Sequence, residues 1–237
     1  MIAPSPPALT LISVCICTFR RSSVAETLLS LGELILPPET RIEVVVADND
    51  REPSARETVE AAARKIEWPV HYVHAPAANI SVARNACLDS AQGEMCAFID
   101  DDETATPVWL SRLVAVMQRD AADAVLGPVR AVYAEGTPSW MRDHDFHSTY
   151  PVVVKGTIRT GYTCNVLIDR RSQALRGLSF DLSRGRSGGE DTEFFTRLHL
   201  AGGRISYADD AWVEEPVPSN RARFKWLAAR RYRMGQT

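Results

Sequence analysis

Residues 95–103 read MCAFIDDDE, an apolar run that leads directly into a cluster of acids. The apolar run Met95–Ile99 predicts a short buried strand, and four acidic residues follow it without a break. Adjacent aspartates at a strand end repel one another, so a purely structural role is electrostatically unfavourable. Mg²⁺ or Mn²⁺ would relieve the repulsion, because such a cation accepts one or two carboxylates together with water and phosphate oxygens. The stretch therefore predicts a strand that ends at a cation site.

The alternating geometry of a strand suggests that these aspartates have different binding roles. If the backbone stays extended, Asp100 and Asp102 face one way and Asp101 faces the other. One face would then hold the metal and the other the ribose of a nucleotide. The alternative for this motif taken alone is a solvated acidic turn.

Apolar strands and helical segments alternate on both sides of this stretch, which predicts an α/β fold with a mostly parallel sheet covered by helices on both faces. The expected order is strand 11–19, helix 23–32, strand 42–47, helix 54–65, strand 70–74, helix 81–92, strand 95–99 and helix 106–119. Ser23 with Glu26 and Ser54 with Glu57 form capping boxes, and Thr106 and Pro107 suit an N-cap and first helical turn. Parallel sheets bind ligands beyond the carboxyl ends of their strands. The sequence Asp48-Asn49-Asp50 lies at another such end, where a carboxylate could contact a nucleobase or ribose, although these are also common turn residues.

Two further segments carry groups that suit chemistry. Arg84 lies one turn into the helix after Asn79 and could reach a base carbonyl or a phosphate, or be an ordinary surface arginine. Gly188-Gly189 precede Glu190-Asp191, and glycines there allow close backbone approach and aim Asp191 out of the turn. Asp191 could be a base that takes the proton of an acceptor hydroxyl. Acids in a first helical turn also have a structural explanation in the helix dipole.

The second half is less regular. We expect strands at 124–133, 152–155 and 162–168, and a helix from Glu190 that buries Phe194, Leu198 and Ala201. Trp140, in the loop between the first two strands, could stack on a sugar or belong to the core. No linker separates the halves, so a single domain is expected, with a nucleotide-sugar-binding half at 1–104 and an acceptor-binding and catalytic-base half at 105–237.

Composition limits the class of protein. With 45% hydrophobic and 24% charged residues, the chain is neither disordered nor fibrous. No apolar stretch approaches the roughly 20 residues that cross a bilayer. Five cysteines without framework spacing favour free thiols in a cytoplasmic protein, with Cys15 and Cys17 on one strand face in a structural role. The net charge is −3, yet 218–237 is basic and without acids, so it could meet a diphosphate, a membrane surface or the acidic cleft, or be a solvated helix face.

Together these motifs resemble glycosyltransferase family 2, with its GT-A fold. The resemblance spans nearly the whole chain. Its parts are the strand Val14–Phe19, VVVADND, NISVARN, FIDDDE with Pro107 and Trp109-Leu110, TCNVLIDRR, GGEDTEF and the closing Trp226, Arg230, Arg231 and Arg233-Met234-Gly235. Each part is common, and the order and spacing make the resemblance specific.

The resemblance implies an inverting, metal-dependent transfer of a hexose from a nucleotide-diphosphate sugar, with UDP as the expected nucleotide. The residues it would assign to the nucleotide are Thr18, Arg20, Asp48, Asp50, Arg84 and Asp101. Asp102, helped by Asp100, would bind Mg²⁺ or Mn²⁺. Asp191 would be the base with Glu190 near the acceptor, and Asn165, with Trp140, would line the sugar or acceptor pocket. Glu214-Glu215-Pro216 resembles branches that build bacterial exopolysaccharides on lipid-linked acceptors.

The resemblance also implies a location and partners. The expected acceptor is a saccharide or lipid-linked saccharide, with peripheral contact at the inner face of the membrane through the basic C-terminal segment and no nucleic-acid partner. Many relatives continue beyond the position of Thr237, so elements that close over the donor would lie outside this sequence. The second strand ends in Asp-Asn-Asp instead of the commoner Asp-Asp-Gly-Ser, which leaves the base contact open.

Two alternatives remain at this stage. Residues 100–104 also fit the D-x-D-x-T motif of haloacid-dehalogenase-type phosphatases, in which Asp100 would be the phosphorylated nucleophile and Asp102 a general acid and base. That motif normally opens its domain, whereas about three strands precede it here. The other alternative is a non-catalytic module that binds a nucleotide sugar.

Overall fold

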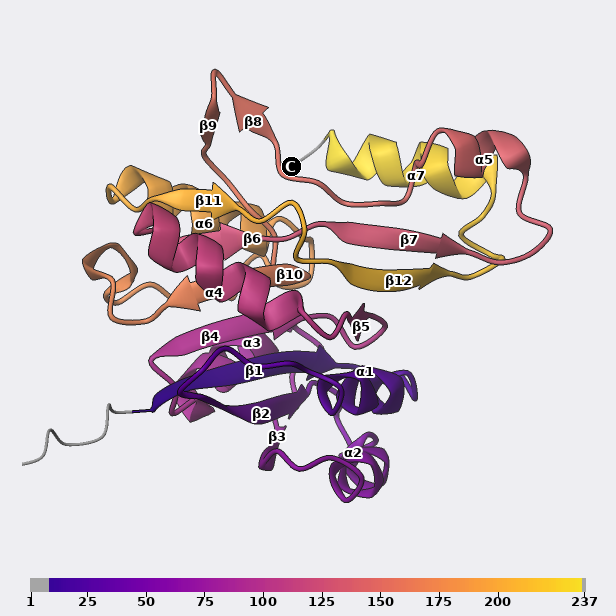
Figure 1. The fold of residues 1–237 in the computed structure, drawn as a ribbon. Helices are drawn as coiled ribbons and strands as arrows, with labels where there is room; N and C mark the ends of the chain where they lie inside the picture. The colour runs from indigo at the N-terminus through magenta and orange to yellow at the C-terminus, as the bar shows by residue number, and fades with distance from the viewer. Residues whose placement is uncertain (1–8, 236–237) are drawn as a thin grey trace, which may run out of the picture.

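The computed structural model describes residues 9–235, apart from the side chains of Arg233 and Met234. Residues 1–8 and 236–237 lie outside it, so the end of the predicted basic segment is not described. Within the described chain, the central sheet has seven strands in the order β11-β6-β10-β4-β1-β2-β3 (Figure 1). These are β1 Thr10–Thr18, β2 Thr40–Asp48, β3 Val70–His74, β4 Met95–Ile99, β6 Ala124–Leu126, β10 Asn165–Asp169 and β11 Ile205–Tyr207. Neighbours pair in parallel except at β10, which is antiparallel to β4 and β6. The predicted α/β fold with a mostly parallel sheet is confirmed.

Helices cover both faces of this sheet, because each strand alternates its side chains between two apolar layers. Ile12, Val14 and Ile16 of β1 face one layer, in which α1 (Val24–Leu31), α2 (Arg56–Ala63) and α4 (Trp109–Asp120) pack. Cys15 and Cys17 face the other layer, formed by α3 (Ile80–Ser90) and α6 (Glu190–Leu200). The cysteines are free thiols packed in the core, in agreement with the predicted structural role for Cys15 and Cys17.

A smaller sheet, β5-β12-β7, stands beside the large one (Figure 1). The remaining elements are β5 Thr104–Ala105, β7 Val129–Tyr133, α5 Ser139–Asp143, β8 Val153–Val154, β9 Thr157–Ile158, the 3₁₀ helix Gln173–Leu175, β12 Val213–Val217 and α7 Phe224–Met234. The prediction of one strand over 124–133 is therefore wrong. Gly127-Pro128 divides it, since proline has no N–H for a ladder, and the two pieces enter different sheets.

The predicted helix caps are also wrong in detail, because tertiary partners replace local ones. Ser23 occupies the N-cap of α1 but makes no side-chain cap bond. Helix α2 begins after Ala55 instead of Ser54, and the Ala55 N–H donates to Asp48 Oδ2 across 2.8 Å. The Thr106 hydroxyl donates to the Trp212 carbonyl oxygen at 2.9 Å instead of capping a helix, and α4 begins three residues later.

The burial of α6 follows the prediction with one exception. Phe194 and Leu198 are buried, whereas Ala201, expected in the core, is exposed because the helix ends at Leu200. None of the helices within residues 9–235 is long and apolar enough to cross a bilayer.

Candidate active site

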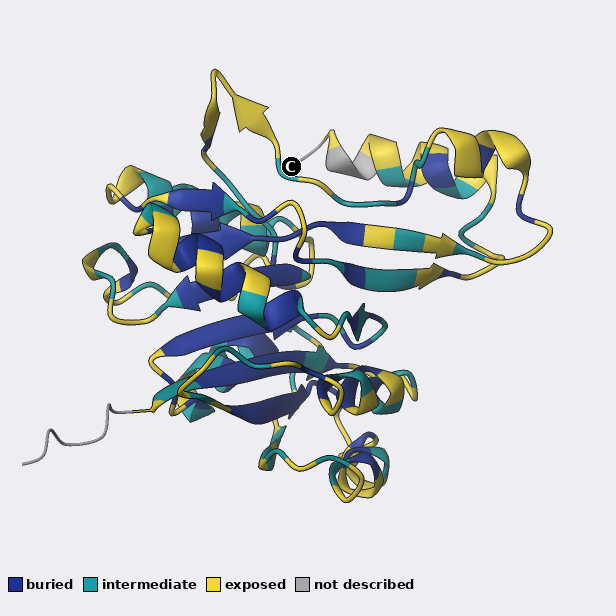
Figure 2. Ribbon diagram, in the orientation of Figure 1, coloured by how far each residue is buried: buried dark blue, intermediate teal, exposed yellow. Residues whose placement is uncertain are grey.

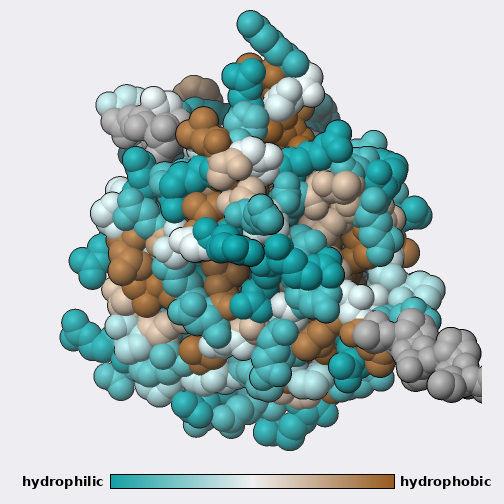
Figure 3. Space-filling view, turned by 90° about the vertical axis from the view of Figure 1, so that its left-hand side faces the viewer, coloured by the Kyte–Doolittle hydropathy of each residue, from teal (hydrophilic) through white to brown (hydrophobic). Residues whose placement is uncertain are grey.

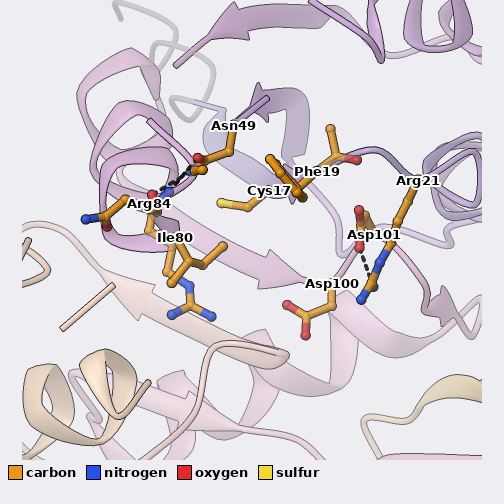
Figure 4. Close-up of a pocket in the computed structure, with 11 residues that line it drawn as sticks. Cys17, Phe19, Arg21, Asn49, Ile80, Arg84, Asp100 and Asp101 are labelled. Atoms are coloured by element: carbon orange, nitrogen blue, oxygen red, sulfur yellow. Dashed lines mark hydrogen bonds and ion pairs between the residues drawn. The ribbon is translucent and has the colours of Figure 1, made fainter. Parts of the chain in front are cut away.

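A cavity of about 410 Å³ opens at the edge where β1, β2 and β4 end (Figure 4). The parallel pairing of Thr18 with Asp48 brings the first two strand ends level. The lining residues are Cys17, Thr18, Phe19, Arg21, Asn49, Ala78, Asn79, Ile80, Arg84, Asp100 and Asp101. Three positions predicted to contact the nucleotide, Thr18, Arg84 and Asp101, thus share one cavity with the predicted metal ligand Asp100.

Arg20 and Asp50 lie beside this cavity instead of in its wall. The Arg20 guanidinium binds the Asp50 carboxylate through two contacts of 2.9 Å, and both residues line a neighbouring hollow that shares Phe19 and Ala78 with the cavity. The hydrogen bond from Arg20 lowers the pKa of Asp50 to about 2. The ion pair between Arg20 and Asp50 therefore forms a charged edge of the cavity that a nucleotide could contact.

Asp48 has a different position from the one predicted. Its side chain is fully buried, with Oδ1 accepting from the Asp50 N–H at 3.0 Å and Oδ2 from the Ala55 N–H and the Tyr72 hydroxyl at 2.8 and 2.7 Å. A carboxylate so occupied holds the loop after β2 in shape. The neighbouring Asn49 lines the cavity instead. We therefore revise the direct contact between Asp48 and a nucleobase to a positioning role.

Residues 100–103, called the acid tip below, form a turn instead of continuing the strand. The Glu103 N–H donates to the Asp100 carbonyl, and the Asp100 N–H donates to Glu103 Oε2 at 2.9 Å. The predicted alternation is therefore wrong: Asp100 and Asp101 line the same cavity (Figure 4), whereas Asp102 lines a different hollow. The prediction depends on an extended backbone, and the turn at 100–103 rotates the side chains out of that geometry.

Two further arginines form ion pairs with Asp101 and Asp102 of the acid tip. Arg21 Nη1 lies 2.8 Å from Asp101 Oδ1 and 2.6 Å from Asp102 Oδ2. Arg221 Nη2 lies 3.6 Å from the same oxygen of Asp102, and its Nη1 lies 2.7 Å from Glu215. Arg21 is adjacent to the predicted Arg20, and Arg221 belongs to the basic segment. The signals were present in the sequence, but only the fold shows which arginine faces the acids.

The acid tip fits a hard divalent cation. No hydrogen bond reaches the Asp100 carboxylate in the part of the chain that the structure describes, and burial raises its pKa to about 7. Burial also raises the pKa of the Glu103 carboxyl well above its ordinary value. A cation would relieve this shortage of positive charge. The described residues contain no group of three or more His, Cys, Asp or Glu side chains that could hold a metal, so phosphate oxygens and water would have to complete the coordination, as Mg²⁺ allows.

Arg84 connects the acid tip to the opening of α6. Its buried guanidinium forms an ion pair with Glu190 and lies over the Phe180 ring. Burial alone would lower the pKa of Arg84, but the charges of Asp100, Asp191 and Glu190 outweigh it and raise the pKa. Carboxylates about 90 residues apart in the sequence therefore interact with one guanidinium.

Asp191 is held in place by the entry to α6. Gly188 and Gly189 have φ of +94° and +84°, a left-handed conformation that other residues rarely adopt. Asp191 Oδ1 accepts from the Thr192 N–H at 2.7 Å, and burial raises the Asp191 pKa. Glu190 Oε2 is buried and without a hydrogen-bond partner among the described residues. The helix thus presents one carboxylate fixed by Arg84 and one suited to accept a proton.

Asn165 and Trp140 lie outside the cavity. Asn165 is fully buried, donates to the carbonyls of Pro128 and Ala211 at 2.8 Å and accepts from Trp109 Nε1 at 2.8 Å. Its amide is occupied, so we revise its predicted contact with a sugar to a positioning role. Trp140 lies on α5, where it packs edge-on against the Phe146 ring, and its use as a sugar platform stays a prediction.

Residues 13–175 match the profile of glycosyl transferase family 2. The chain belongs to this family. It is 54% identical over 226 residues to the succinoglycan biosynthesis protein ExoM of Rhizobium meliloti, covering 95% of this chain and 73% of that protein. It is 26% identical over 173 residues to the poly(ribitol-phosphate) β-N-acetylglucosaminyltransferase TarS of Staphylococcus aureus, covering 73% of this chain but 30% of TarS.

Solved structures agree with the family 2 assignment at the level of the fold. The crystal structure of S. aureus TarS superposes with a TM-score of 0.67 at 23% identity, over 88% of this chain and 37% of that one. The mannosyltransferase PcManGT of Pyrobaculum calidifontis, solved with GDP-Man and Mn²⁺, gives a TM-score of 0.69 at 20% identity, over 99% of this chain and 63% of that one. The GT-A fold is thus confirmed.

The family assignment decides between the alternatives left open by the motifs. A family 2 chain is a glycosyltransferase, so the interpretation of Asp100 as a phosphorylated nucleophile is wrong. The three strands before the acid tip, β1, β2 and β3, belong to the same sheet as β4, so the D-x-D-x-T match does not open the domain here. Family membership equally favours an enzyme over a module that only binds a nucleotide sugar.

Proposed function

We propose that this chain transfers a hexose from a UDP-sugar, with inversion, to a saccharide or lipid-linked saccharide in bacterial exopolysaccharide biosynthesis. The observation that carries the proposal is the position of Arg84, which lines the donor cavity with Asp100 and pairs with Glu190 beside Asp191. The similarity to ExoM supports the polysaccharide context. Structures of TarS with UDP-GlcNAc and with UDP support the choice of nucleotide.

In this proposal the two halves of the chain have separate tasks. Residues 1–104 hold the donor: Thr18 and Asp101 inside the cavity, Arg20 and Asp50 at its rim, and Arg84 toward the diphosphate. Residues 105–237 supply the base and the acceptor side. Mg²⁺ or Mn²⁺ at Asp100 and Asp102 would supply positive charge to the departing nucleoside diphosphate. The protein would act at the cytoplasmic face of the membrane, with the basic segment 218–237 toward the lipid.

The proposed chemical step assigns the role of general base to Asp191. Asp191 takes the proton of an acceptor hydroxyl, and that oxygen attacks the anomeric carbon as the bond to the diphosphate breaks. Attack opposite the leaving group inverts the anomeric centre, by the same facial logic as in inverting hydrolases. Glu190 stays paired with Arg84 and keeps that guanidinium beside the cavity.

Two substitutions separate these roles. Asp191→Asn should lower transfer by about 10²–10⁴-fold, the usual contribution of a general base, and leave donor binding intact. Asp102→Asn should instead weaken donor binding that depends on Mn²⁺. Thermal shift with the donor and transfer assays would measure both, with the exposed Asp209→Asn as a matched control. Full transfer by the Asp191 variant would rule out the assigned base.

The nucleotide is tested by a panel of UDP-, GDP- and dTDP-sugars with and without Mn²⁺. A ligand that binds only the folded state stabilises it by about 2.7 kcal/mol at a hundredfold excess over Kd. We expect the largest increase in Tm with a UDP-sugar and Mn²⁺ together. A larger increase with GDP-sugars would overturn the choice of UDP without affecting the rest of the proposal.

A further inference from the structure

The β8–β9 hairpin and the residue before it expose valine side chains that no strand or helix among residues 9–235 covers. Val152, Val153 and Val154 are 63%, 58% and 42% exposed. The two strands pair only with each other within the described chain, around a turn in which Lys155 and Gly156 have positive φ. The hairpin projects from the upper end of the molecule in Figure 1 and Figure 2, and Figure 3 shows hydrophobic surface beside a hydrophilic tip at that end. A short isolated hairpin gains no stability from solvated valines, so their exposure suggests a contact.

Helix α7 presents a second apolar and basic face at the same end of the molecule (Figure 1). Its inner side is anchored, because Leu227 is buried and Trp226 stacks on His147. At about 100° per residue, a set of exposed side chains falls within an outer arc of about 120°. The set is Phe224, Lys225, Ala228, Arg231 and Tyr232. Phe224 and Tyr232 are 72% and 70% exposed.

The charge of the two segments that contain the β8–β9 hairpin and α7 indicates the chemistry of the partner. No Asp or Glu occurs in 146–168 or in 216–237, although the whole chain has a net charge of −3. The cations of these segments are Lys155, Arg159, Arg221, Arg223, Lys225, Arg230, Arg231 and Arg233. Exposed apolar and aromatic side chains among cations without acids suit the headgroup region of an anionic bilayer.

We propose that the β8–β9 hairpin and the outer face of α7 form one docking surface for an anionic lipid bilayer, into which Val152–Val154 insert. This inference deepens the proposed function, since it gives a lipid-linked acceptor a membrane surface next to the site. Arg221, at the entry to α7, contacts Asp102 of the acid tip, so the docking surface is joined to the active site by a direct ion pair. The apolar hairpin supplies insertion, and the cations of α7 supply attraction to the surface.

The test is flotation of the full chain with vesicles of phosphatidylcholine alone or with about one third phosphatidylglycerol. We expect binding to the anionic vesicles only, weakened by salt. Val153→Asp should lower the partition coefficient at least about tenfold, and Arg231→Glu should lower it by a similar factor. Leu200→Asp, at a side chain that is 77% exposed at the end of α6, is the matched control and should bind as the unchanged chain does.

Each other outcome has a defined meaning. No preference for anionic vesicles overturns the inference and leaves a protein partner as the occupant of the surface. Loss of binding in Arg231→Glu but not in Val153→Asp overturns the role of the hairpin. Donor binding and donor hydrolysis without vesicles report on the proposed function separately, and all variants should keep both if they are folded. A docking failure with intact hydrolysis would thus leave the proposed transfer standing.

Discussion

The cavity is bordered by two arginine–carboxylate groups that differ in their surroundings. Around the acid tip, Arg21 and Arg221 are partly exposed and share one oxygen of Asp102. At the opening of α6, the pair between Arg84 and Glu190 is buried. Exposed ion pairs exchange partners at little cost, whereas a buried pair is fixed because separating it leaves an uncompensated charge. The comparison predicts that Arg21 and Arg221 would exchange partners if a cation bound at the acid tip, whereas Arg84 would keep its pair with Glu190.

Arg84→Met should have the largest effect on stability. It leaves Glu190 buried without its partner, and removing one member of a buried pair costs about 3–5 kcal/mol. Urea or thermal unfolding would measure this loss. Arg119→Met, at an exposed arginine paired with Asp120, is the matched control and should leave the free energy of unfolding nearly unchanged. Equal losses in both variants would contradict the contrast between the two groups.

Arg221→Ala should have a smaller effect, with opposite signs for two ligands. The partly exposed guanidinium contributes about 0–1 kcal/mol to folding. Its removal takes one positive charge from beside Asp102 and leaves Oδ2 of that residue with Arg21 alone, so Mn²⁺ alone should bind several-fold more tightly. UDP with Mn²⁺ should bind less tightly, because a cation near the diphosphate is lost. Calorimetric titration of each ligand would measure both changes. Weaker binding of Mn²⁺ alone would contradict the exchange of partners.

The smallest expected effect is a change in the pH dependence at Asp191. Burial raises the pKa of this carboxyl in the folded state, so it keeps a proton that the unfolded chain has lost. The folded state binds more protons in that window, and stability therefore falls as pH rises from the unfolded value to the raised one. Transfer should fall as pH drops through the raised pKa. Asp191→Asn should lack this slope and be the more stable form above the window, as unfolding at a series of pH values would show.

The sequence predicted elements better where local pattern and tertiary partners agree. Strand β4 and the long apolar strands β1 and β2 follow their side-chain periodicity, and α6 begins at Glu190 as expected. The helix caps failed where a distant group competed, as when Asp48 bonded the Ala55 N–H and made the Ser54 cap unnecessary. Strand β10 was found in the sequence, but its antiparallel direction between β4 and β6 was not, because direction leaves no mark on an apolar run.

The site shows the same limit. Residue type and strand end selected Asp100, Asp101 and Arg84, which line one cavity, and Asp191, whose charge acts on Arg84. They could not place the Asn165 side chain, because the sequence does not show whether an amide is buried with three hydrogen bonds or faces a ligand. They also did not show that Arg21 pairs with Asp101 and Asp102 of the acid tip.

Chemistry and order along the chain were determined by the sequence itself: which residues can ionise, which strands they follow, and that glycines precede Asp191. Such properties are local, and the periodicity of a segment reports them. Only the tertiary structure decided which groups meet. Residues 100–103 turn, and that turn, with the packing of α6 and α7 against the sheet, sets which carboxylate faces Arg21, Arg84 or Arg221. Ion pairs between distant segments depend on how whole elements pack, and no stretch of sequence contains that information alone.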